Sequence, residues 1–426
     1  MNEDTQLLII GSGPAGMAAA IAAAPYATQI VLVDDNPFTG GQIWRDGPQA
    51  SLPDQARELR ERLLACTNVR LHSGTRVIAS AGPKSLLLEN AERGWQINYD
   101  RLILCTGARE LLLPFPGWTL PGVTGAGGLQ ALIKSGLTVH EQRIVIAGSG
   151  PLLLASAATA KKNAAKVLRI AEQASLGAIA RFASQLPRWP HKLVQSFNLF
   201  DRHYRPQSHV LAALGNGRLE AVRLLQQGKI VEIDCDRLAC GFGLIPNSQL
   251  GQALGYELAG QAIAVDAWQA GSRPDHYAAG ECTGFGGSEL ALVEGAIAGY
   301  AAVGELDLAK RLWPRRARWQ GFADALNQAF TLTPGLKTLA EPDTLVCRCE
   351  DVAYSALAGH DNWREAKLAS RCGMGACQGR ICGGAVHHLF GWQPSAPRPP
   401  FSPARIETLM CLDDTPLPES LSPIYS

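Results

Sequence analysis

Two apolar runs in the first half of the chain are each followed by closely spaced glycines and then by an alanine-rich stretch. The first run is Leu7–Ile10, and the second lies within Arg143–Ala147. A short, uninterrupted apolar run is typical of a strand that is buried on both faces, as the strands of parallel sheets are. The order of strand, glycine turn and helix occurs twice, and it predicts an α/β protein with two Rossmann-like units.

The first glycine turn has the full G-x-G-x-x-G spacing. The first glycine permits a tight turn, the second lets the backbone approach a pyrophosphate, and the third lets the helix pack closely on the strand. The N-terminus of the following helix favours phosphate charge. We therefore expect this loop to bind a dinucleotide, and its residues are Gly11, Gly13, Pro14, Ala15 and Gly16.

A further apolar run, Ile30–Val33, ends at Asp34 and Asp35. Asp34 follows the glycine turn at about the spacing of the acid that binds the ribose hydroxyls in dinucleotide folds. We expect these two acids to lie at the ribose of the bound nucleotide.

The second glycine turn is altered, because Leu153 stands where the third glycine is expected after Gly148 and Gly150. A leucine there is expected to press the helix away from the strand and to narrow the phosphate cradle. Glu172 follows the next strand, where a ribose-binding acid could lie. The sequence predicts that the fold of an NAD domain is kept and its NAD(P)H site impaired. The alternative is that Leu153 is accommodated and NADH still binds.

Composition and charge narrow the function classes. The 426 residues predict two to three domains. Lys and Arg number 39 and Asp and Glu 38, a balance that argues against a nucleic-acid partner. The basic segment Arg311–Trp319 is therefore interpreted as a linker helix. The chain has neither a secretory signal nor a long apolar run, so we expect no transmembrane segment and a cytoplasmic location.

Eleven cysteines are present, and five of them are crowded near the C-terminus. Clustered cysteines in a cytoplasmic protein more often bind metal or do redox chemistry than form disulfides. A C-x-C pair and a C-x4-C pair with glycines between them could surround two irons, and a mononuclear zinc site is the alternative. The five residues are Cys347, Cys349, Cys372, Cys377 and Cys382.

Three segments resemble parts of two-domain flavoproteins of the disulfide-reductase type. Gly40–Ile43 resembles their Gly-Gly-Gln segment, and Leu102–Ala108 resembles their strand and Thr-Gly turn. Tyr277–Glu281 resembles the segment whose acid, usually Asp, binds the ribityl chain of FAD. This resemblance implies FAD in the first site and adds the contact residues Gly41, Gln42, Thr106, Gly107, Gly280 and Glu281. No C-x-x-C or C-x4-C redox pair follows the first glycine turn.

The cysteine-rich segment resembles the bacterioferritin-associated-ferredoxin-like 2Fe–2S domain, a small helical unit. The match rests on the C-x-C pair and on the Gly-Met-Gly-x-Cys-Gln-Gly-x-x-Cys pattern at 373–382. By this resemblance Cys372 is an extra thiol, and the metal ligands are Cys347, Cys349, Cys377 and Cys382.

Taken together, residues 1–390 resemble the α subunit of heteromeric, dye-linked amino-acid and imino-acid dehydrogenases. This family includes opine oxidases, D-hydroxyproline dehydrogenase, L-proline dehydrogenase complexes and hydrogen cyanide synthase. The shared features are the FAD-type loop, the degenerate second loop, the segment Ala279–Glu281 and the C-terminal cysteines.

The resemblance implies an oxidoreductase subunit that acts on CH–NH or CH–NH2 donors. A D-amino-acid-oxidase-like flavoprotein β subunit would oxidise a D-amino acid, an imino acid such as proline or hydroxyproline, or an opine. The α subunit would carry the electrons through its own flavin region and its 2Fe–2S cluster. The same resemblance also implies a small ferredoxin-like γ subunit and a complex that is peripheral to the inner membrane. ATP in the first nucleotide site and FMN at a subunit interface are the alternatives to FAD.

The expected fold is α/β, a two-dinucleotide-binding-domain flavoprotein with the second Rossmann-like domain inserted in the first, plus a small helical C-terminal 2Fe–2S domain. The expected boundaries are 1–107 and 262–304 for the FAD-binding domain, 108–261 for the NAD-like domain, 305–344 for a helical linker, 345–390 for the cluster domain and 391–426 for a Pro-rich tail. Two rival functions remain at this point, a self-contained NAD(P)H-dependent flavoprotein reductase of a ferredoxin or quinone, and a non-catalytic scaffold. The sequence identifies neither a catalytic residue nor the substrate.

Overall fold

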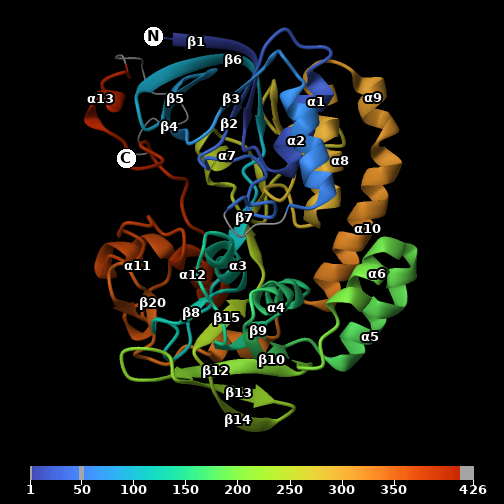
Figure 1. Cartoon of the computed structure of the whole chain (residues 1–426). Coiled ribbons are helices and arrows are strands. Elements are labelled where there is room, and N and C mark those ends of the chain that lie inside the picture. Colours follow the sequence, from blue (N-terminus) through green and yellow to red (C-terminus); the bar gives the residue numbers. More distant parts are fainter. Residues whose placement is uncertain (1, 48–51, 413–426) are drawn as a thin grey trace.

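The two largest sheets, of seven and five strands, each form the centre of a lobe, and the two lobes lie one above the other in Figure 1. The computed structural model describes residues 2–47 and 52–412. The last part of the expected tail, 413–426, lies outside the described residues. None of the helices within the described ranges is both long and apolar enough to cross a membrane.

The upper lobe is built on a seven-stranded sheet in the order β3-β2-β1-β6-β5-β4, with β19 also paired to β6. β2, β1, β6 and β19 run parallel to one another, whereas β4, β5 and β6 form an antiparallel meander. The elements are β1 (Asn2–Ile10), α1 (Pro14–Ala23), β2 (Ile30–Val33), α2 (Asp54–Leu64), β3 (Val69–His72), β4 (Arg76–Gly82), β5 (Ser85–Glu89), β6 (Gly94–Leu104), β19 (His276–Ala278) and α8 (Gly287–Ala302).

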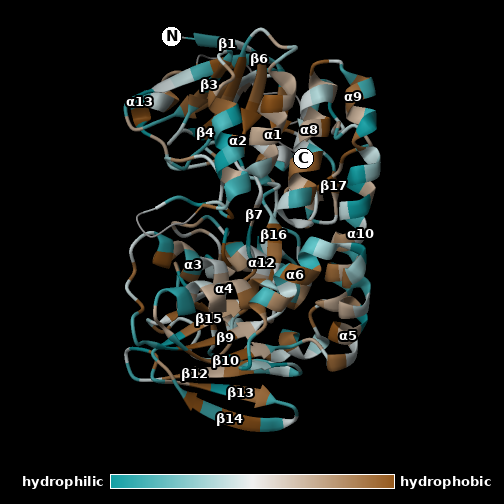
Figure 2. Cartoon of the chain, turned by 45° about the vertical axis from the view of Figure 1, so that its right-hand side comes forward, coloured by the Kyte–Doolittle hydropathy of each residue, from teal (hydrophilic) through white to brown (hydrophobic). Residues whose placement is uncertain are grey.

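Small residues let the two central helices of the upper lobe approach closely. A Cβ atom on Gly295 of α8 would lie 2.1 Å from the carbonyl oxygen of Ala15 in α1, and one on Gly299 would lie 2.3 Å from that of Ala19. The alanine-rich helix α1 therefore packs against glycines that lie 280 residues later in the chain. Figure 2 shows hydrophobic strands in this lobe and hydrophilic residues on the outlying helix α2.

The lower lobe contains a five-stranded parallel sheet in the order β11-β10-β9-β15-β8 and a three-stranded antiparallel sheet. The antiparallel sheet lies at the base of the molecule in Figure 1. The elements are β8 (Val123–Gly125), α3 (Ala126–Lys134), β9 (Arg143–Gly148), α4 (Leu152–Lys162), β10 (Lys166–Glu172), α5 (Leu176–Gln185), α6 (Pro190–Leu199), β11 (Tyr204–Arg205), β12 (Ser208–Leu214), β13 (Ala221–Gln226), β14 (Lys229–Asp234) and β15 (Arg237–Gly241).

The chain passes between the lobes on two short antiparallel strands, β7 (Ala108–Glu110) and β16 (Leu244–Pro246). The sequence predicts the return to the first domain at residue 262. In the structure Leu254 and Tyr256 already pack with Ile263 in the core of the upper lobe. The upper lobe therefore resumes just after β16, because these apolar side chains are buried against its sheet.

The C-terminal third connects both lobes. α10 (Trp313–Ala329) follows α9 (Leu306–Arg311) and runs down one side of the molecule (Figure 1). The cluster domain comprises β20 (Leu345–Cys347), β21 (Val352–Ala353), α11 (Trp363–Ser370) and α12 (Cys382–Phe390) and lies beside the lower lobe. The described part of the tail returns to the upper lobe, where α13 (Ile406–Leu409) lies near the meander and Thr408 donates a hydrogen bond to Glu89.

Candidate functional site

The expected residues of the first nucleotide site gather at one edge of the upper sheet. They follow the carboxyl ends of the parallel strands β2, β1, β6 and β19, which are neighbours in that order. Ligands of open α/β sheets bind at this edge. The residues there are Gly11, Gly13, Pro14, Ala15, Gly16, Asp34, Asp35, Gly41, Gln42, Thr106, Gly107, Gly280 and Glu281.

The three glycines of the first turn have different surroundings. A Cβ atom on Gly11 would lie 2.2 Å from the carbonyl oxygen of Cys105, and one on Gly16 would lie 1.8 Å from that of Gly11. These two glycines are required by the packing of the protein itself. Gly13 has no such neighbour, since the nearest atom to its Cβ position is the Cα of Gly41 at 3.8 Å. A Cβ atom on Gly13 would therefore clash with no described protein atom and would only touch Gly41, so the packing of the protein does not itself require this glycine.

The N-terminus of α1 is suited to an anionic group. No side chain caps this helix, Pro14 opens it, and its first turn contains no acidic residue. Gly41 stands over the turn, because its own Cβ position is only 3.1 Å from the Cα of Gly13. Backbone N–H groups of α1 and the segment carrying Gly41 thus form a cradle that fits a pyrophosphate.

The two acids after β2 differ in their environment. Asp34 is 7% exposed, and its carboxylate accepts hydrogen bonds of 2.8 Å from the Ser12 hydroxyl and from the Asn36 backbone N–H. Asp34 therefore braces the glycine turn. Asp35 is exposed beside it. The role of either acid at a ribose stays a prediction.

Other expected contacts connect the lobes or face solvent. The Thr106 hydroxyl donates a 2.6 Å hydrogen bond to the carbonyl oxygen of Asn247, which ties the turn after β6 to the return segment. Apart from its own chain neighbours, none of the described residues has an atom within 4 Å of the Cβ position of Gly107. Gln42 is exposed, and its amide oxygen accepts a hydrogen bond from Arg45.

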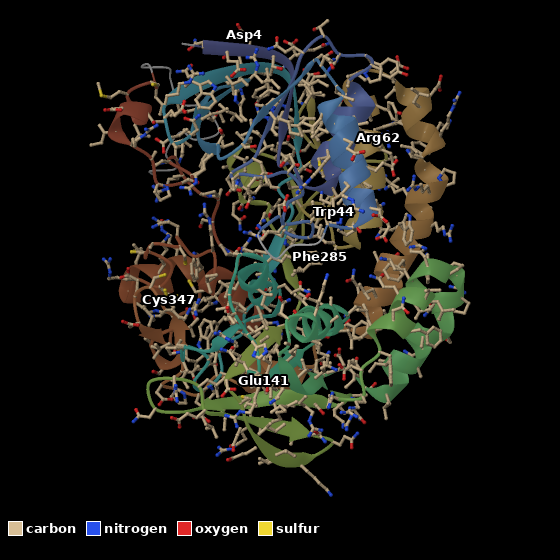
Figure 3. The ribbon with its side chains drawn as sticks, viewed as in Figure 1. Asp4, Trp44, Arg62, Glu141, Phe285 and Cys347 are labelled. Atoms are coloured by element: carbon tan, nitrogen blue, oxygen red, sulfur yellow. The ribbon has the colours of Figure 1, made fainter. Side chains whose placement is uncertain are left out.

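Glu294 is a residue that the sequence reasoning missed. It is 5% exposed in α8, and its carboxylate accepts a 3.1 Å hydrogen bond from the N–H of Gly280. Burial raises the pKa of Glu294 to about 7 and also raises the pKa of Glu281. In the sequence, the only feature that points to Glu294 is that it is a single acidic residue in the otherwise apolar stretch 290–298. In Figure 3, Phe285 lies between the lobes, and Trp44 lies above it in the core of the upper lobe.

The second glycine turn is covered by the protein's own chain. The Ser149 hydroxyl donates a 2.8 Å hydrogen bond to the carbonyl oxygen of Phe330, at the end of α10. A Cβ atom at position 150 would lie 3.8 Å from the side chain of Phe330. The amide of Gln173 donates to Ser149 and to the carbonyl oxygen of Thr331. The segment 330–331 therefore packs directly against the second glycine turn.

Leu153 is accommodated in the core of the lower lobe. It is fully buried, and its side chain lies 3.1 Å from the Cβ position of Gly241 on β15. A glycine on the neighbouring strand thus provides the space that the missing third glycine of the turn would have given.

Glu172 is not available to a ribose. It is 0% exposed, and its carboxylate accepts a 2.7 Å hydrogen bond from the N–H of Gly150, a 2.9 Å bond from that of Ala174 and a 3.2 Å bond from the Tyr204 hydroxyl. Burial raises the pKa of Glu172 to about 7. Its oxygens stabilise the turn from within.

The five C-terminal cysteines gather in the cluster domain, where Figure 3 labels Cys347. The Sγ atoms of Cys347, Cys372 and Cys382 all lie within 4.8 Å of one another, and all three residues are buried. Cys349 and Cys377 lie next to each other, and Cys349 is exposed. The four expected ligands therefore lie together, and Cys372 lies among them. An all-thiolate donor set fits an iron–sulfur cluster and also fits zinc.

Glycines let the cysteine loops approach each other. A Cβ atom on Gly375 would lie 2.3 Å from the Cβ of Cys349, and one on Gly373 would lie 2.7 Å from the Trp363 ring. The backbone of the second cysteine loop is thereby brought against the first.

The cluster domain packs on the strands that join the two lobes. The Arg109 guanidinium on β7 donates a 2.9 Å hydrogen bond to the carbonyl oxygen of Arg380, which lies between Cys377 and Cys382. A Cβ atom on Gly384 of α12 would lie 2.0 Å from the side chain of Ile245 on β16. The cysteine loop is therefore in contact with the strand that directly follows the Thr106–Gly107 turn.

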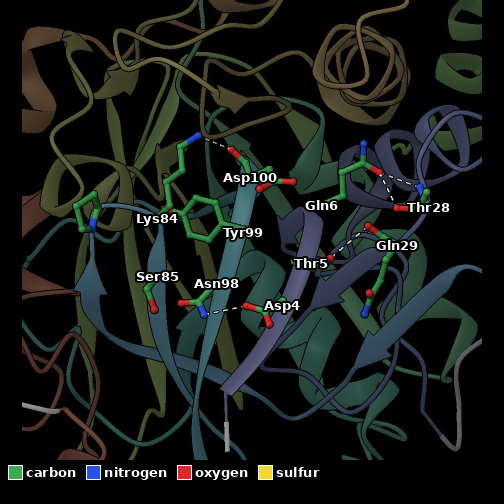
Figure 4. Close-up of a pocket in the computed structure, with 11 residues that line it drawn as sticks. Asp4, Thr5, Gln6, Thr28, Gln29, Lys84, Ser85, Asn98, Tyr99 and Asp100 are labelled. Carbon is green, nitrogen blue, oxygen red and sulfur yellow. Dashed lines mark hydrogen bonds between the residues drawn. The ribbon is translucent and has the colours of Figure 1, made fainter.

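Two hollows lie outside these sites. A pocket of 390 Å³ between α3, β8 and the cluster domain has mostly apolar walls, with Arg348 at its lining 4.8 Å from the Trp118 ring centre. A wide-mouthed hollow of 750 Å³, drawn in Figure 4, is lined by polar residues that include Asp4, Thr28 and Asp100. It lies near the amino ends of β1 and β2, away from the edge that carries the glycine turn.

The chain is similar to known oxidoreductases along most of its length. The family model for pyridine nucleotide-disulphide oxidoreductase matches residues 5–299. The HcnB subunit of hydrogen cyanide synthase from Pseudomonas protegens is 32% identical, over 88% of this chain and 90% of that protein. The opine oxidase A-subunit of Rhizobium meliloti is 30% identical, over 97% of this chain and 89% of that protein.

Solved structures share the fold at lower identity. L-proline dehydrogenase from P. horikoshii superposes with a TM-score of 0.66 at 19% identity, covering 96% of this chain and 80% of that one. Thioredoxin reductase from T. acidophilum has a TM-score of 0.53 at 18% identity, covering 71% of this chain and 99% of that one. Almost the whole of that thioredoxin reductase is thus matched by part of this chain, and the rest of this chain has no counterpart in it.

Proposed function

The chain belongs to the pyridine nucleotide-disulphide oxidoreductase family and is an oxidoreductase. From that premise we propose that it is the electron-transfer α subunit of a heteromeric flavin/iron–sulfur dehydrogenase of amino acids, imino acids or opines. One observation carries the proposal. The cysteine loop packs on the strands beside the first nucleotide site, whereas the second glycine turn is filled by residues of the chain itself. The first contact supports an electron path between the first nucleotide site and the cysteines. The second contact argues against entry of NAD(P)H at the second glycine turn.

The relatives' names support the substrate class and the partner. They are called subunits of opine oxidase and of hydrogen cyanide synthase. The proposed donor is a D-amino acid, an imino acid such as proline or hydroxyproline, or an opine, oxidised at a CH–NH or CH–NH2 bond. We place this step on a D-amino-acid-oxidase-like flavoprotein β subunit. The further proposed partner is a small ferredoxin-like γ subunit.

FAD is the proposed occupant of the first site, with ATP there or FMN at a subunit interface as the alternatives. The cradle at Gly13 and Gly41 would hold the pyrophosphate, since the start of α1 has no side-chain cap and its first turn has no acidic residue. The Gly280–Glu281 turn would face the ribityl chain. When bound, a flavin accepts an electron pair and can release it one electron at a time. The chain's contribution is to bind and orient it beside the cysteine loop.

A 2Fe–2S cluster held by Cys347, Cys349, Cys377 and Cys382 is the proposed one-electron carrier. The support is the meeting of all four thiols in one small domain, together with glycines that let both loops close around them. Such a cluster suits the splitting of a flavin's electron pair because it takes one electron at a time.

The test uses the chain co-expressed with the proposed β subunit. Cys377→Ser is compared with Cys66→Ser, a change in the upper lobe far along the chain from the cluster loops. We expect substrate-dependent dye reduction to fall at least tenfold in Cys377→Ser only. Full turnover with lower thermal stability in Cys377→Ser would instead support a scaffold. Rapid flavin bleaching by NADH in the isolated chain would support a self-contained reductase.

A further inference from the structure

Cys372 lies inside the thiol cluster, although the cysteine motif of the resembling 2Fe–2S domains does not include it. It is 0% exposed, and its Sγ atom is within 4.8 Å of those of both Cys347 and Cys382. No other cysteine stands in the same relation to the remaining pair, Cys349 and Cys377, among the described residues. The spare thiol is therefore associated with one side of the cluster only.

The position of Cys372 is fixed by the end of α11. Arg371 ends the helix in the left-handed conformation with φ of 66°, and its side chain donates a 2.7 Å hydrogen bond to Glu350, next to Cys349. The N–H of Cys372 donates to the Ser370 hydroxyl over 3.2 Å. Gly373 follows with φ of 81°, close against the Trp363 ring. These contacts hold the turn in place and direct the thiol inward.

Ligand geometry divides the five thiols into two groups. A 2Fe–2S cluster takes four thiolates, two on each iron. With metal–sulfur bonds of about 2.3 Å, two thiolates on one tetrahedral metal are about 4 Å apart. The separations among Cys347, Cys372 and Cys382 match a shared iron. The neighbouring pair Cys349 and Cys377 is then the ligand pair of the other iron.

We propose that Cys372 is a reserve ligand for the iron bound by Cys347 and Cys382, an inference that rests on the proposed 2Fe–2S function. Loss of either buried ligand leaves two thiols of the group, enough for that iron. Loss of Cys349 or Cys377 leaves a single thiol on the other side, with no replacement. The proposal thus predicts an asymmetry between the two halves of the cluster.

The asymmetry is measured on the full chain, purified without oxygen together with its partner. Each of Cys347, Cys349, Cys377 and Cys382 is changed to Ser, once in the native background and once with Cys372→Ser. Iron and acid-labile sulfide per chain and the electron paramagnetic resonance spectrum after dithionite reduction are recorded. Cys372→Ala serves as a second variant that keeps the buried site apolar, and thermal unfolding checks that each protein is folded.

We expect Cys382→Ser and Cys347→Ser to keep most of the wild-type iron with shifted resonance positions, and to lose it when Cys372→Ser is added. Cys349→Ser and Cys377→Ser should lose the iron in both backgrounds. Equal iron loss in all four single variants, with the fold intact, would overturn the reserve role. The wild-type chain tests the proposed function before any variant does. If it contained no iron and sulfide, or contained zinc, the proposed 2Fe–2S function itself would be overturned.

Discussion

The Ser149 hydroxyl donates a 2.8 Å hydrogen bond to the carbonyl oxygen of Phe330, so the end of α10 is bound to the second glycine turn. Gln173 completes the contact by donating to Ser149 and accepting from the N–H of Thr333 over 3.1 Å. The turn that would receive NADH in a reductase is thus a docking point for the linker. It helps to set the position of α10, which runs between the lobes.

The intact chain should not bind NADH measurably, so any Kd for NADH should be weaker than about 1 mM. The reason is that Phe330 and Thr331 lie on the face of the turn that the pyrophosphate needs. Titration calorimetry on the purified chain is the measurement. Saturable binding in the micromolar range would show that the segment 330–333 moves aside easily, and would restore the reductase as a candidate.

Removing the hydroxyl should loosen the linker. Ser149→Ala is expected to lower the free energy of unfolding by about 1 kcal/mol, the usual net value of a part-buried hydrogen bond. Urea denaturation measures the change. Ser184→Ala is the matched control, because its hydroxyl bonds to the Arg181 carbonyl oxygen at an exposed position of α5. An equal effect in both variants would argue against a special role for the Ser149 contact.

Leu153→Ala should destabilise the lower lobe by about 2–5 kcal/mol without creating an NADH site. Leu153 is fully buried against Gly241, so its truncation leaves a cavity between α4 and the sheet. The control is Leu176→Ala on α5, where the side chain is 56% exposed and the expected change is within about 0.5 kcal/mol. NADH binding gained by Leu153→Ala would mean that the leucine itself excludes the nucleotide.

The buried acid Glu172 should make stability depend on pH near neutrality. Its pKa is raised by burial from 4.5 to about 7, so between these values the folded state binds more protons than the unfolded state. The contribution of Glu172 to stability is therefore full below about pH 4.5 and is lost as the pH rises through 7. The shift corresponds to about 3 kcal/mol.

Glu172→Gln imitates the protonated acid and should remove this dependence. The unfolding free energy of the wild type, taken relative to the variant, is expected to fall between pH 5 and 8 in urea denaturation series. Glu61→Gln, an exposed change on α2, is the control and should show no such trend. A constant difference between wild type and Glu172→Gln would mean that Glu172 is ionised throughout this range.

The sequence predicts local features of the site well because short spacings carry them. The turn from Gly11 to Gly16 and the two cysteine pairs each lie within a few residues, so their geometry follows from glycine and thiol positions along one segment. Parallel strands then bring such segments to a common edge. The α/β architecture with Rossmann-like sheets, expected from the repeated strand–turn–helix order, is confirmed.

Features that depend on distant partners could not be predicted. Phe330 meets Ser149 across 181 positions, and no pattern near either residue indicates the contact. Leu153 looks disruptive in the sequence because its compensation, Gly241, lies on another strand. Glu294 gives only the weak signal of a lone acid in an apolar helix. In each case the deciding atom belongs to a segment that becomes a neighbour only after folding.

Gly13→Ala offers a test of the first nucleotide site that leaves the fold intact. Gly13 has φ of −69°, which alanine adopts without strain, and the nearest protein atom to its Cβ position is 3.8 Å away. The unfolding free energy should therefore change by less than about 1 kcal/mol. The added methyl group nevertheless enters the space that a pyrophosphate needs at the start of α1. We expect the amount of FAD, or of any nucleotide, that copurifies with the chain to fall at least tenfold.

Two other glycine variants make the result specific. Gly16→Ala places its methyl group 1.8 Å from the Gly11 carbonyl oxygen, so it should lower stability together with nucleotide content. Gly177→Ala in α5 has no atom within 4 Å and should change neither. Nucleotide released by acid and quantified by chromatography, beside thermal unfolding, separates the three cases. If Gly13→Ala retained its nucleotide while remaining folded, the glycine turn would be a structural element only, and the first electron carrier would have to be bound elsewhere in the complex.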